Sequence, residues 1–262
     1  MTDPSLKLTV LGSGTSTGVP VLGCHCAVCS SSDPRNSRTR CSVLLEWSGR
    51  KVLIDTATDF RQQALREGIE QIDSVLFTHA HADHVHGIDD LRTFTLRTGN
   101  AIPAYADRGV LDRLKGLFSY IFSESDAPGY RPRLQVNEVV GPFDLFGQTV
   151  VPIPLLHGPG ESLGYRVGNL AYIVDCSALP ESSWRLLQGL EVLVIDALRF
   201  REHESHFSIS EAIEVAKKLR VPRTLLTHLT HDIDYPRHAT GLPDGVEFAY
   251  DGQTLTLPLP GN

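Results

Sequence analysis

Residues with the chemistry of metal ligands are concentrated in one short segment of the 262-residue chain. A strand-like apolar run, residues 74–78, leads directly into His79, His81, Asp83 and His84. Side chains two positions apart in extended backbone project to the same side, so His79 and His81 can meet one ion. Asp83 and His84, at a turn into a helix, can serve a second ion. Imidazole and carboxylate are ligands that Zn²⁺, Mn²⁺ and Fe²⁺ accept, and two ions about 3.5 to 4 Å apart can clamp both ends of a displacement.

A second concentration of ligand-type residues lies in the segment 23–30. Three of the five cysteines are found there, at Cys24, Cys26 and Cys29. The first residues lack the basic and apolar features of a secretory signal, so we expect a cytoplasmic protein with reduced thiols. Disulfides are therefore not expected, and the grouped cysteines and histidines together indicate bound metal.

The charge and hydropathy of the chain exclude two classes of partner. Lys and Arg number 24 against 31 Asp and Glu, which gives a net charge of -7, and no basic run is present. A long polyanion such as a nucleic acid is therefore not an expected partner. The longest apolar runs, for example residues 192–195, are far shorter than the roughly 20 residues that a membrane-spanning helix needs. We expect no membrane partner.

The elements that must position these residues alternate along the chain, which predicts an α/β or mixed fold. Strands are expected at residues 6–11, 42–47, 51–55, 74–78, 149–155, 163–167, 171–175, 192–196 and 223–227. Ser208 and Glu211 predict a capping box for a helix that ends before Pro222, and a second helix is expected over residues 59–67. Without a linker-like stretch, residues 1–262 are expected to form one domain, with an irregular excursion at 119–133.

The ligand-rich segment resembles the metallo-β-lactamase superfamily, whose His-x-His-x-Asp-His signature it matches. The other motif positions of that family fall, in chain order, on Asp55, His157, Asp175 and His228. The resemblance covers residues from about 6 to 257. It implies an α/β fold, the four-layer αββα sandwich, with the ions at one edge between the two sheets.

The same resemblance assigns the ligands of two divalent ions, Zn or Mn. One ion is assigned to His79, His81 and His157, and the other to Asp83, His84 and His228. Asp175 would bridge the ions, and a hydroxide between them would be the nucleophile, since two dications lower the pKa of water from roughly 15.7 toward about 7. Asp55 matches the carboxylate that orients a ligand histidine. A turn-forming role is the alternative for Asp55.

The segment 11–29 is similar to the phosphodiesterase branch, which contains tRNase Z and the phosphoribosyl cyclic phosphate phosphodiesterases of carbon–phosphorus lyase pathways. The cysteine-rich loop at 23–30 resembles the second group. There, the positions that bind a structural zinc correspond to Cys24, Cys26, Cys29 and His231. Three thiolates and one imidazole make a closed tetrahedral site, which suits holding a loop in place. His25 or Cys41 remains an alternative fourth ligand, and a redox role for the thiols is the competing interpretation.

A phosphodiester also requires a proton donor for the leaving oxygen. His206 lies where this branch places its general acid, and Asp196 can orient it and hold its proton. His203 is the nearest rival. The residues expected to take part in catalysis are therefore His206, Asp83, Asp175 and Asp196.

The resemblance implies a small phosphodiester substrate. Only residues 158–174 separate His157 from Asp175, where tRNase Z would carry its long arm, and the net charge is -7. The substrate implied is 5-phosphoribosyl 1,2-cyclic phosphate, opened to ribose 1,5-bisphosphate in phosphonate metabolism. The alternatives are a carboxylic ester, thioester or lactone hydrolase, a tRNase Z-like endonuclease, and a non-enzymatic metal sensor. The sequence leaves the choice between a monomer and a homodimer open.

The distal part of the substrate has only weakly indicated partners. Candidates for holding a terminal phosphate or ring are Arg131, Arg133, Arg199, Arg201 and Tyr130. Ser13, Thr15 and Ser16 are expected to line the metal cleft.

Overall fold

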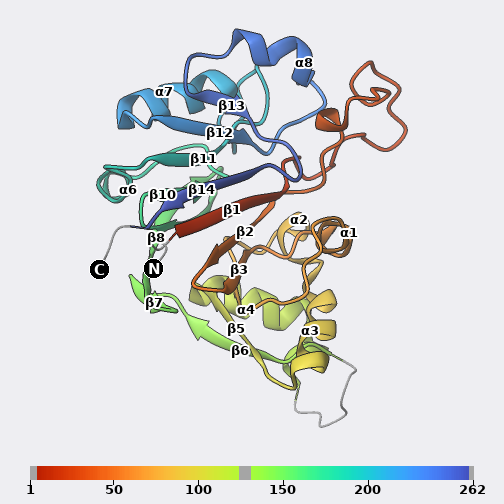
Figure 1. Ribbon diagram of the computed structural model, residues 1–262, viewed down its shortest axis with the longest axis vertical. Coiled ribbons are helices and arrows are strands. Elements are labelled where there is room, and N and C mark those ends of the chain that lie inside the picture. Colours follow the sequence, from red (N-terminus) through yellow and green to blue (C-terminus); the bar gives the residue numbers. More distant parts are fainter. Residues whose placement is uncertain (1–4, 124–130, 260–262) are drawn as a thin grey trace.

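Two seven-stranded sheets lie face to face in the computed structural model, which describes residues 5–123 and 131–259 (Figure 1). The first sheet has the order β14 (Thr254–Pro258), β1 (Ser5–Gly12), β2 (Ser42–Trp47), β3 (Arg50–Ile54), β4 (Ser74–Leu76), β5 (Ile102–Ala106), β6 (Leu134–Glu138). The second has the order β13 (Val246–Phe248), β12 (Arg223–Thr227), β11 (Val192–Asp196), β10 (Leu170–Ile173), β9 (Gly160–Val167), β8 (Gln148–His157), β7 (Phe143–Leu145).

Helices cover the outer face of each sheet (Figure 1). Those beside the first sheet are α1 (Phe60–Arg66), α2 (Ala82–Val85), α3 (Arg92–Thr98), α4 (Arg108–Leu117) and α5 (Ser119–Phe122). Those beside the second are α6 (Glu181–Leu186), α7 (Ile209–Leu219) and α8 (Tyr235–His238). Short 3-10 turns lie at Pro34–Asn36, Ile88–Leu91 and Ala239–Gly241. The four-layer αββα sandwich implied by the sequence is therefore confirmed.

Three buried apolar clusters join the four layers. In β10, Leu170 and Tyr172 face the other sheet, whereas Ala171 and Ile173 face the helices. Because side chains alternate between the two faces of a strand, a strand buried on both faces must be a continuous apolar run. This explains why β10 and β11 could be located in the sequence.

Both sheets change from antiparallel to parallel pairing at a central strand. β3 pairs antiparallel with β2 and parallel with β4, and β10 pairs antiparallel with β9 and parallel with β11. The carboxyl ends of parallel neighbours meet at the same edge of a sheet. The residues that follow β3, β4, β10, β11 and β12 are thereby brought to one rim of the sandwich.

The predicted strands and both predicted helices are present, but several elements were missed. Pro103 interrupts β5, because a proline cannot donate to the strand ladder and reads as a break. The strands β7 and β13 span three residues each, too short for an alternating pattern. The helix α7 has the predicted capping box of Ser208 and Glu211. No described helix is long and apolar enough to cross a membrane.

Candidate active site

Strained backbone at three strand ends points side chains into the rim. Asp55, Asp175 and His228 have φ angles of 62°, 52° and 61°, in the left-handed region that side chains with a Cβ rarely adopt. A serine on the neighbouring antiparallel strand fixes two of these positions. Ser42 Oγ donates to the Asp55 carbonyl at 2.8 Å, and Ser162 Oγ donates to the Asp175 carbonyl at 2.8 Å. The two sheets therefore present an aspartate in the same way.

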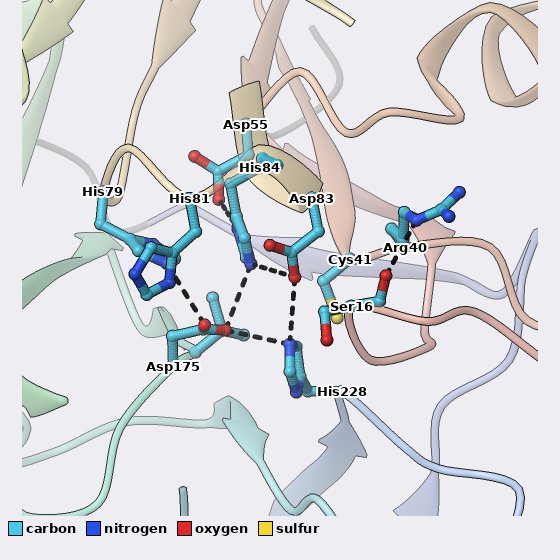
Figure 2. Close-up of polar contacts among 12 residues, drawn as sticks. Ser16, Arg40, Cys41, Asp55, His79, His81, Asp83, His84, Asp175 and His228 are labelled. Carbon is cyan, nitrogen blue, oxygen red and sulfur yellow. Dashed lines mark hydrogen bonds and ion pairs between the residues drawn. The ribbon is translucent and has the colours of Figure 1, made fainter. Parts of the chain in front are cut away.

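Asp175 lies at the centre of the rim, and its two carboxylate oxygens face different groups of histidines (Figure 2). Oδ2 lies 3.3 Å from His79 Nε2 and 3.4 Å from His157 Nε2. His81 joins this group, with Nδ1 3.4 Å from His157 Nε2. The ligand-type atoms of these four residues lie within 4.8 Å of one another.

The other oxygen of Asp175 faces the second group. Oδ1 lies 3.2 Å from His84 Nε2 and 3.1 Å from His228 Nε2. Asp83 Oδ2 completes this group, at 3.4 Å from His84 Nε2 and 3.7 Å from His228 Nε2 (Figure 2). All seven residues expected as ligands are thus brought together, in the two groups that the sequence analysis named.

Polar atoms without partners indicate what these groups hold. Among the described residues, the buried atoms without a hydrogen bond include His79 Nε2, His84 Nε2, His228 Nε2 and Asp175 Oδ1. An unsatisfied buried polar atom costs about 1–3 kcal/mol, so several of them directed toward common points would be unstable alone. Nitrogen and oxygen donors in this arrangement fit two divalent metal ions that share Asp175.

The protonation of three of these ligands suits metal binding. Burial lowers the pKa of His81 to about 4, and His79 and His157 beside it act in the same direction. Burial also lowers the pKa of His157. Burial opposes ionisation of Asp175, but His228, His84 and His79 hold the pKa of this carboxyl well below its usual range. Neutral imidazole and ionised carboxylate are the forms that coordinate metal. His84 differs: burial opposes its protonation, but Asp175, Asp55 and Asp83 raise the pKa of His84 well above its usual range, so a metal there must displace a proton.

Hydrogen bonds at the other ring nitrogens hold these histidines in place. His84 Nδ1 donates to Asp55 Oδ2 at 2.7 Å, and Thr78 N and Oγ1 donate to the same carboxylate at 2.8 and 2.7 Å. His157 Nδ1 donates to the Ser205 carbonyl at 2.8 Å. Such bonds fix the tautomer and leave Nε2 available to a metal. Asp55 therefore has contacts beyond those of a turn residue.

His206 lies beside both groups. Its ring stacks on His228 at 4.7 Å between centroids and meets His157 edge-on at 4.9 Å. Its Nδ1 donates to Asp196 Oδ2 at 2.8 Å, and burial lowers the pKa of His206. His203 is exposed on the same loop and lacks this carboxylate contact. Of the two histidines, His206 is therefore the one that lies against the ligand groups and contacts a carboxylate.

The cysteine-rich loop, residues 23–30, meets the segment after β12. The Sγ atoms of Cys24, Cys26 and Cys29 lie 3.4, 3.6 and 3.4 Å from His231 Nδ1. Zn–S bonds of about 2.3 Å and Zn–N bonds of about 2.0 Å at a tetrahedral angle separate S from N by about 3.5 Å. The four residues therefore fit one tetrahedral ion.

The two alternative fourth ligands lie outside this group. His25 is exposed, and Cys41 is buried with its Sγ 3.5 Å from Thr227 Oγ1. The Cys29 N–H donates to Cys26 Sγ and is the largest cause that lowers the pKa of Cys26, to about 6, whereas burial raises the pKa of Cys29 to about 11. A thiolate at neutral pH is the form that binds zinc.

A hollow of about 810 Å³ opens beside the first group of histidines. His79, His81 and His157 form one side, and Gly109, Val110 and Arg113 of α4 also line it. Arg113 was missed in the sequence, because it stands inside an amphipathic helix and belongs to no motif. The side chain of Glu161 on β9 also borders the hollow.

The arginines proposed from the sequence do not line this hollow. Arg131 donates to the Ile121 carbonyl at 2.6 Å, Arg133 to the Gly99 carbonyl and Arg199 to the Glu202 carbonyl at 3.3 Å. Arg201 pairs with Asp232 at 3.6 Å. Each of these side chains contacts a nearby segment of the chain away from the hollow, and a role for them in holding the substrate stays a prediction.

The other residues expected near the substrate or in the metal cleft differ in where the structure places them. Tyr130 lies outside the described residues. Ser13 Oγ donates to Asp251 Oδ1 at 2.8 Å and is fully buried, so it anchors the loop instead of lining a cleft. Thr15 is buried and its backbone N–H donates to the Leu229 carbonyl. Ser16 is exposed, and its carbonyl accepts from Arg40 Nε at 3.0 Å (Figure 2).

Comparison with known proteins agrees with this arrangement. A family model described as "Beta-lactamase superfamily domain" matches residues 50–229. A crystal structure described as a new diphosphatase from the PhnP family is 43% identical, with a TM-score of 0.91, covering 97% of this chain and 98% of that one. Zinc-bound PqqB from Methylobacterium extorquens is 21% identical, with a TM-score of 0.78, covering 95% and 99%. The last likeness shows the fold alone.

A curated relative extends well beyond the matched region. The octanoyltransferase of Porphyromonas gingivalis is 40% identical over 261 residues, which is 98% of this chain. The chain spans 52% of the length of that relative. The family match over most of the chain and the PhnP-family structure together settle its membership. The chain belongs to the β-lactamase superfamily, and within it to the PhnP family.

Proposed function

We propose that the protein hydrolyses a small cyclic phosphodiester with two divalent ions, zinc or manganese, as cofactors. The substrate that we propose is 5-phosphoribosyl 1,2-cyclic phosphate, a compound of phosphonate metabolism that opens to ribose 1,5-bisphosphate. The observation that carries this proposal is the position of His206. Its ring lies against His157 and His228, which belong to different groups of metal-ligand residues, so an imidazole stands beside both groups that would hold the ions.

The chemistry divides between the ions and the side chains. Two divalent ions at these positions would supply a hydroxide nucleophile at neutral pH and neutralise charge on the phosphoryl group. Asp175 contacts both groups of ligands and sets the spacing between them. Asp55 holds the ring of His84, and the Ser205 carbonyl holds the ring of His157. These contacts fix the ligand geometry before the substrate arrives.

The leaving oxygen needs a proton because ring opening releases a basic alkoxide. The Asp196 carboxylate accepts from His206 Nδ1 at 2.8 Å, which orients the ring. Asp196 is itself held by the Cys176 N–H at 3.0 Å. His206 is therefore proposed as the general acid and Asp196 as its positioning residue.

One other reaction is favoured by a specific observation. The 43% identical structure is described as a diphosphatase, so cleavage of a phosphoric anhydride is our second candidate. An anhydride releases a phosphate, which is a weak base and needs little help from an acid. The buried His206–Asp196 pair therefore favours the cyclic diester. The net charge of -7 disfavours a long RNA.

We also propose that zinc fills the tetrahedral site of Cys24, Cys26, Cys29 and His231. The sulfur–nitrogen distances of 3.4 to 3.6 Å support zinc there. The site needs reduced thiols, which is why we place the protein in the cytoplasm.

The test is a parallel assay of metal-reconstituted protein on four substrates. These are a ribosyl 1,2-cyclic phosphate with a 5-phosphate, a nucleoside diphosphate, bis(p-nitrophenyl) phosphate and p-nitrophenyl acetate. We expect ring opening to give the highest kcat/KM. Faster cleavage of the nucleoside diphosphate would favour the second candidate, and ester cleavage without cleavage of any phosphorus substrate would refute both.

A further inference from the structure

The hollow beside the first metal group is lined by a single arginine and no lysine among the described residues. This is Arg113, which is exposed on α4. Within the described part of the chain, its guanidinium has no hydrogen bond or ion pair. Arg108, on the same helix, differs: it lies 3.4 Å from Glu138 and 3.9 Å from Asp112. The charge of Arg113 is therefore left uncompensated at the wall of the hollow.

Two acidic residues also line the hollow, and neither pairs with Arg113. Asp107 Oδ1 accepts from the Val110 N–H at 2.8 Å, so this carboxylate is engaged in capping α4. Glu161 is exposed near the turn that joins β8 to β9. A carboxylate there can accept hydrogen bonds from hydroxyl groups but repels an anion. The hollow thus offers one site for an anion and one for a hydroxyl-bearing group.

The volume of the hollow exceeds what a reacting phosphodiester alone requires. At about 810 Å³ it falls in the range of about 300–1,000 Å³ that holds a whole small molecule. His79, His81 and His157 border it on the metal side. A substrate whose reacting phosphorus lies at the metals would therefore extend its remaining part toward α4.

We propose that Arg113 binds a second phosphate on the unreacted part of the substrate. This assignment rests on the proposed phosphodiesterase function and makes the preferred substrate a polyol or sugar with two separated phosphorus groups. A guanidinium donates two parallel hydrogen bonds to a phosphate, which gives both affinity and orientation. Arg113 is then a specificity-determining residue, outside the metal groups and without a part in bond breaking.

The test compares two substrates that differ only in the second phosphate. These are ribosyl 1,2-cyclic phosphate with and without the 5-phosphate, and the variants are Arg113→Gln and the matched control Arg108→Gln. Loss of a charge-assisted hydrogen bond to phosphate lowers kcat/KM on the 5-phosphorylated substrate by about 10- to 100-fold in Arg113→Gln. The substrate without the 5-phosphate changes less than about twofold, and so do both substrates in Arg108→Gln. Equal losses on both substrates, or none on either, would overturn the assignment.

A binding measurement separates this inference from the proposed function. Calorimetry on the metal-loaded protein compares ribose 1,5-bisphosphate with ribose 1-phosphate in wild type and Arg113→Gln. We expect wild type to prefer the bisphosphate and Arg113→Gln to lose that preference. If wild type opens neither cyclic ring, the proposed function fails, and the Arg113 assignment stands or falls on this preference alone. An unchanged preference in Arg113→Gln would overturn it.

Discussion

Replacing His206 by asparagine provides the most direct test of the proposed chemistry. The change removes the imidazole that lies 4.7 Å from the ring of His228 and 4.9 Å from that of His157. It leaves the seven metal ligands in place. Asparagine can still donate to Asp196 Oδ2, so the buried carboxylate need not lose its partner.

The expected magnitude follows from what a general acid contributes. Proton transfer from a positioned side chain is worth about 10²- to 10⁴-fold in rate. At 1.36 kcal/mol per factor of ten, this is about 2.7 to 5.4 kcal/mol of transition-state stabilisation. We expect kcat for an alkyl cyclic phosphodiester to fall by this factor, because the leaving alkoxide must be protonated. Metal content is expected to stay that of wild type.

The effect of His206→Asn depends on the basicity of the leaving group. A p-nitrophenolate or a phosphate leaves without a proton, so the variant should cleave bis(p-nitrophenyl) phosphate and a nucleoside diphosphate within about tenfold of the wild-type rate. The assay is steady-state kcat on the three substrates, with metal content measured on the same samples. Asp196→Asn should lie between wild type and His206→Asn for the alkyl substrate.

Two results would refute the reasoning about His206. One is an equal loss of rate on all substrates with metal content unchanged, because a general acid cannot affect all leaving groups alike. The other is a larger loss in the control His203→Asn, which removes an exposed histidine of the same loop. The control is expected to stay within about twofold of wild type, as surface substitutions usually do.

The other predictions concern the metal groups and the loop that supports them. Asp175→Asn should lower the content of both active-site ions and abolish turnover, because the two carboxylate oxygens of Asp175 face different groups of ligands. Elemental analysis that finds two bound ions in this variant would contradict the prediction. Cys26→Ser should remove one zinc and lower the Tm, while the activity of the folded fraction is retained, and His25→Ala should change neither. Arg38→Met removes hydrogen bonds from a buried guanidinium to two carbonyls and an amide oxygen, which should destabilise the fold by about 2 to 4 kcal/mol in denaturant unfolding. Arg35→Met, at a partly exposed arginine that pairs with Asp33, should change stability by less than about 1 kcal/mol.

The local sequence was sufficient to locate the central strands and the metal-ligand motifs. β10 and β11 are buried on both faces and therefore appear as unbroken apolar runs. The cluster from His79 to His84 follows β4 directly in the chain, so the spacing of its ligands can be read from neighbouring residues of the sequence. Edge strands such as β6 and β13 could not be located, because their pairing depends on partners elsewhere in the chain.

The meeting of distant segments was decided only by the tertiary structure. Cys24 and His231 are 207 positions apart, and the register of two sheets brings them to 3.4 Å. The same packing divides the oxygens of Asp175 between two groups and turns Arg113 of α4 toward the hollow instead of the loop arginines. Sequence alone determined which residue types were available and how each strand and helix is patterned. Which side chains share a site was decided by the packing of two sheets, because distances between separate strands depend on register and strand order, which no local spacing encodes.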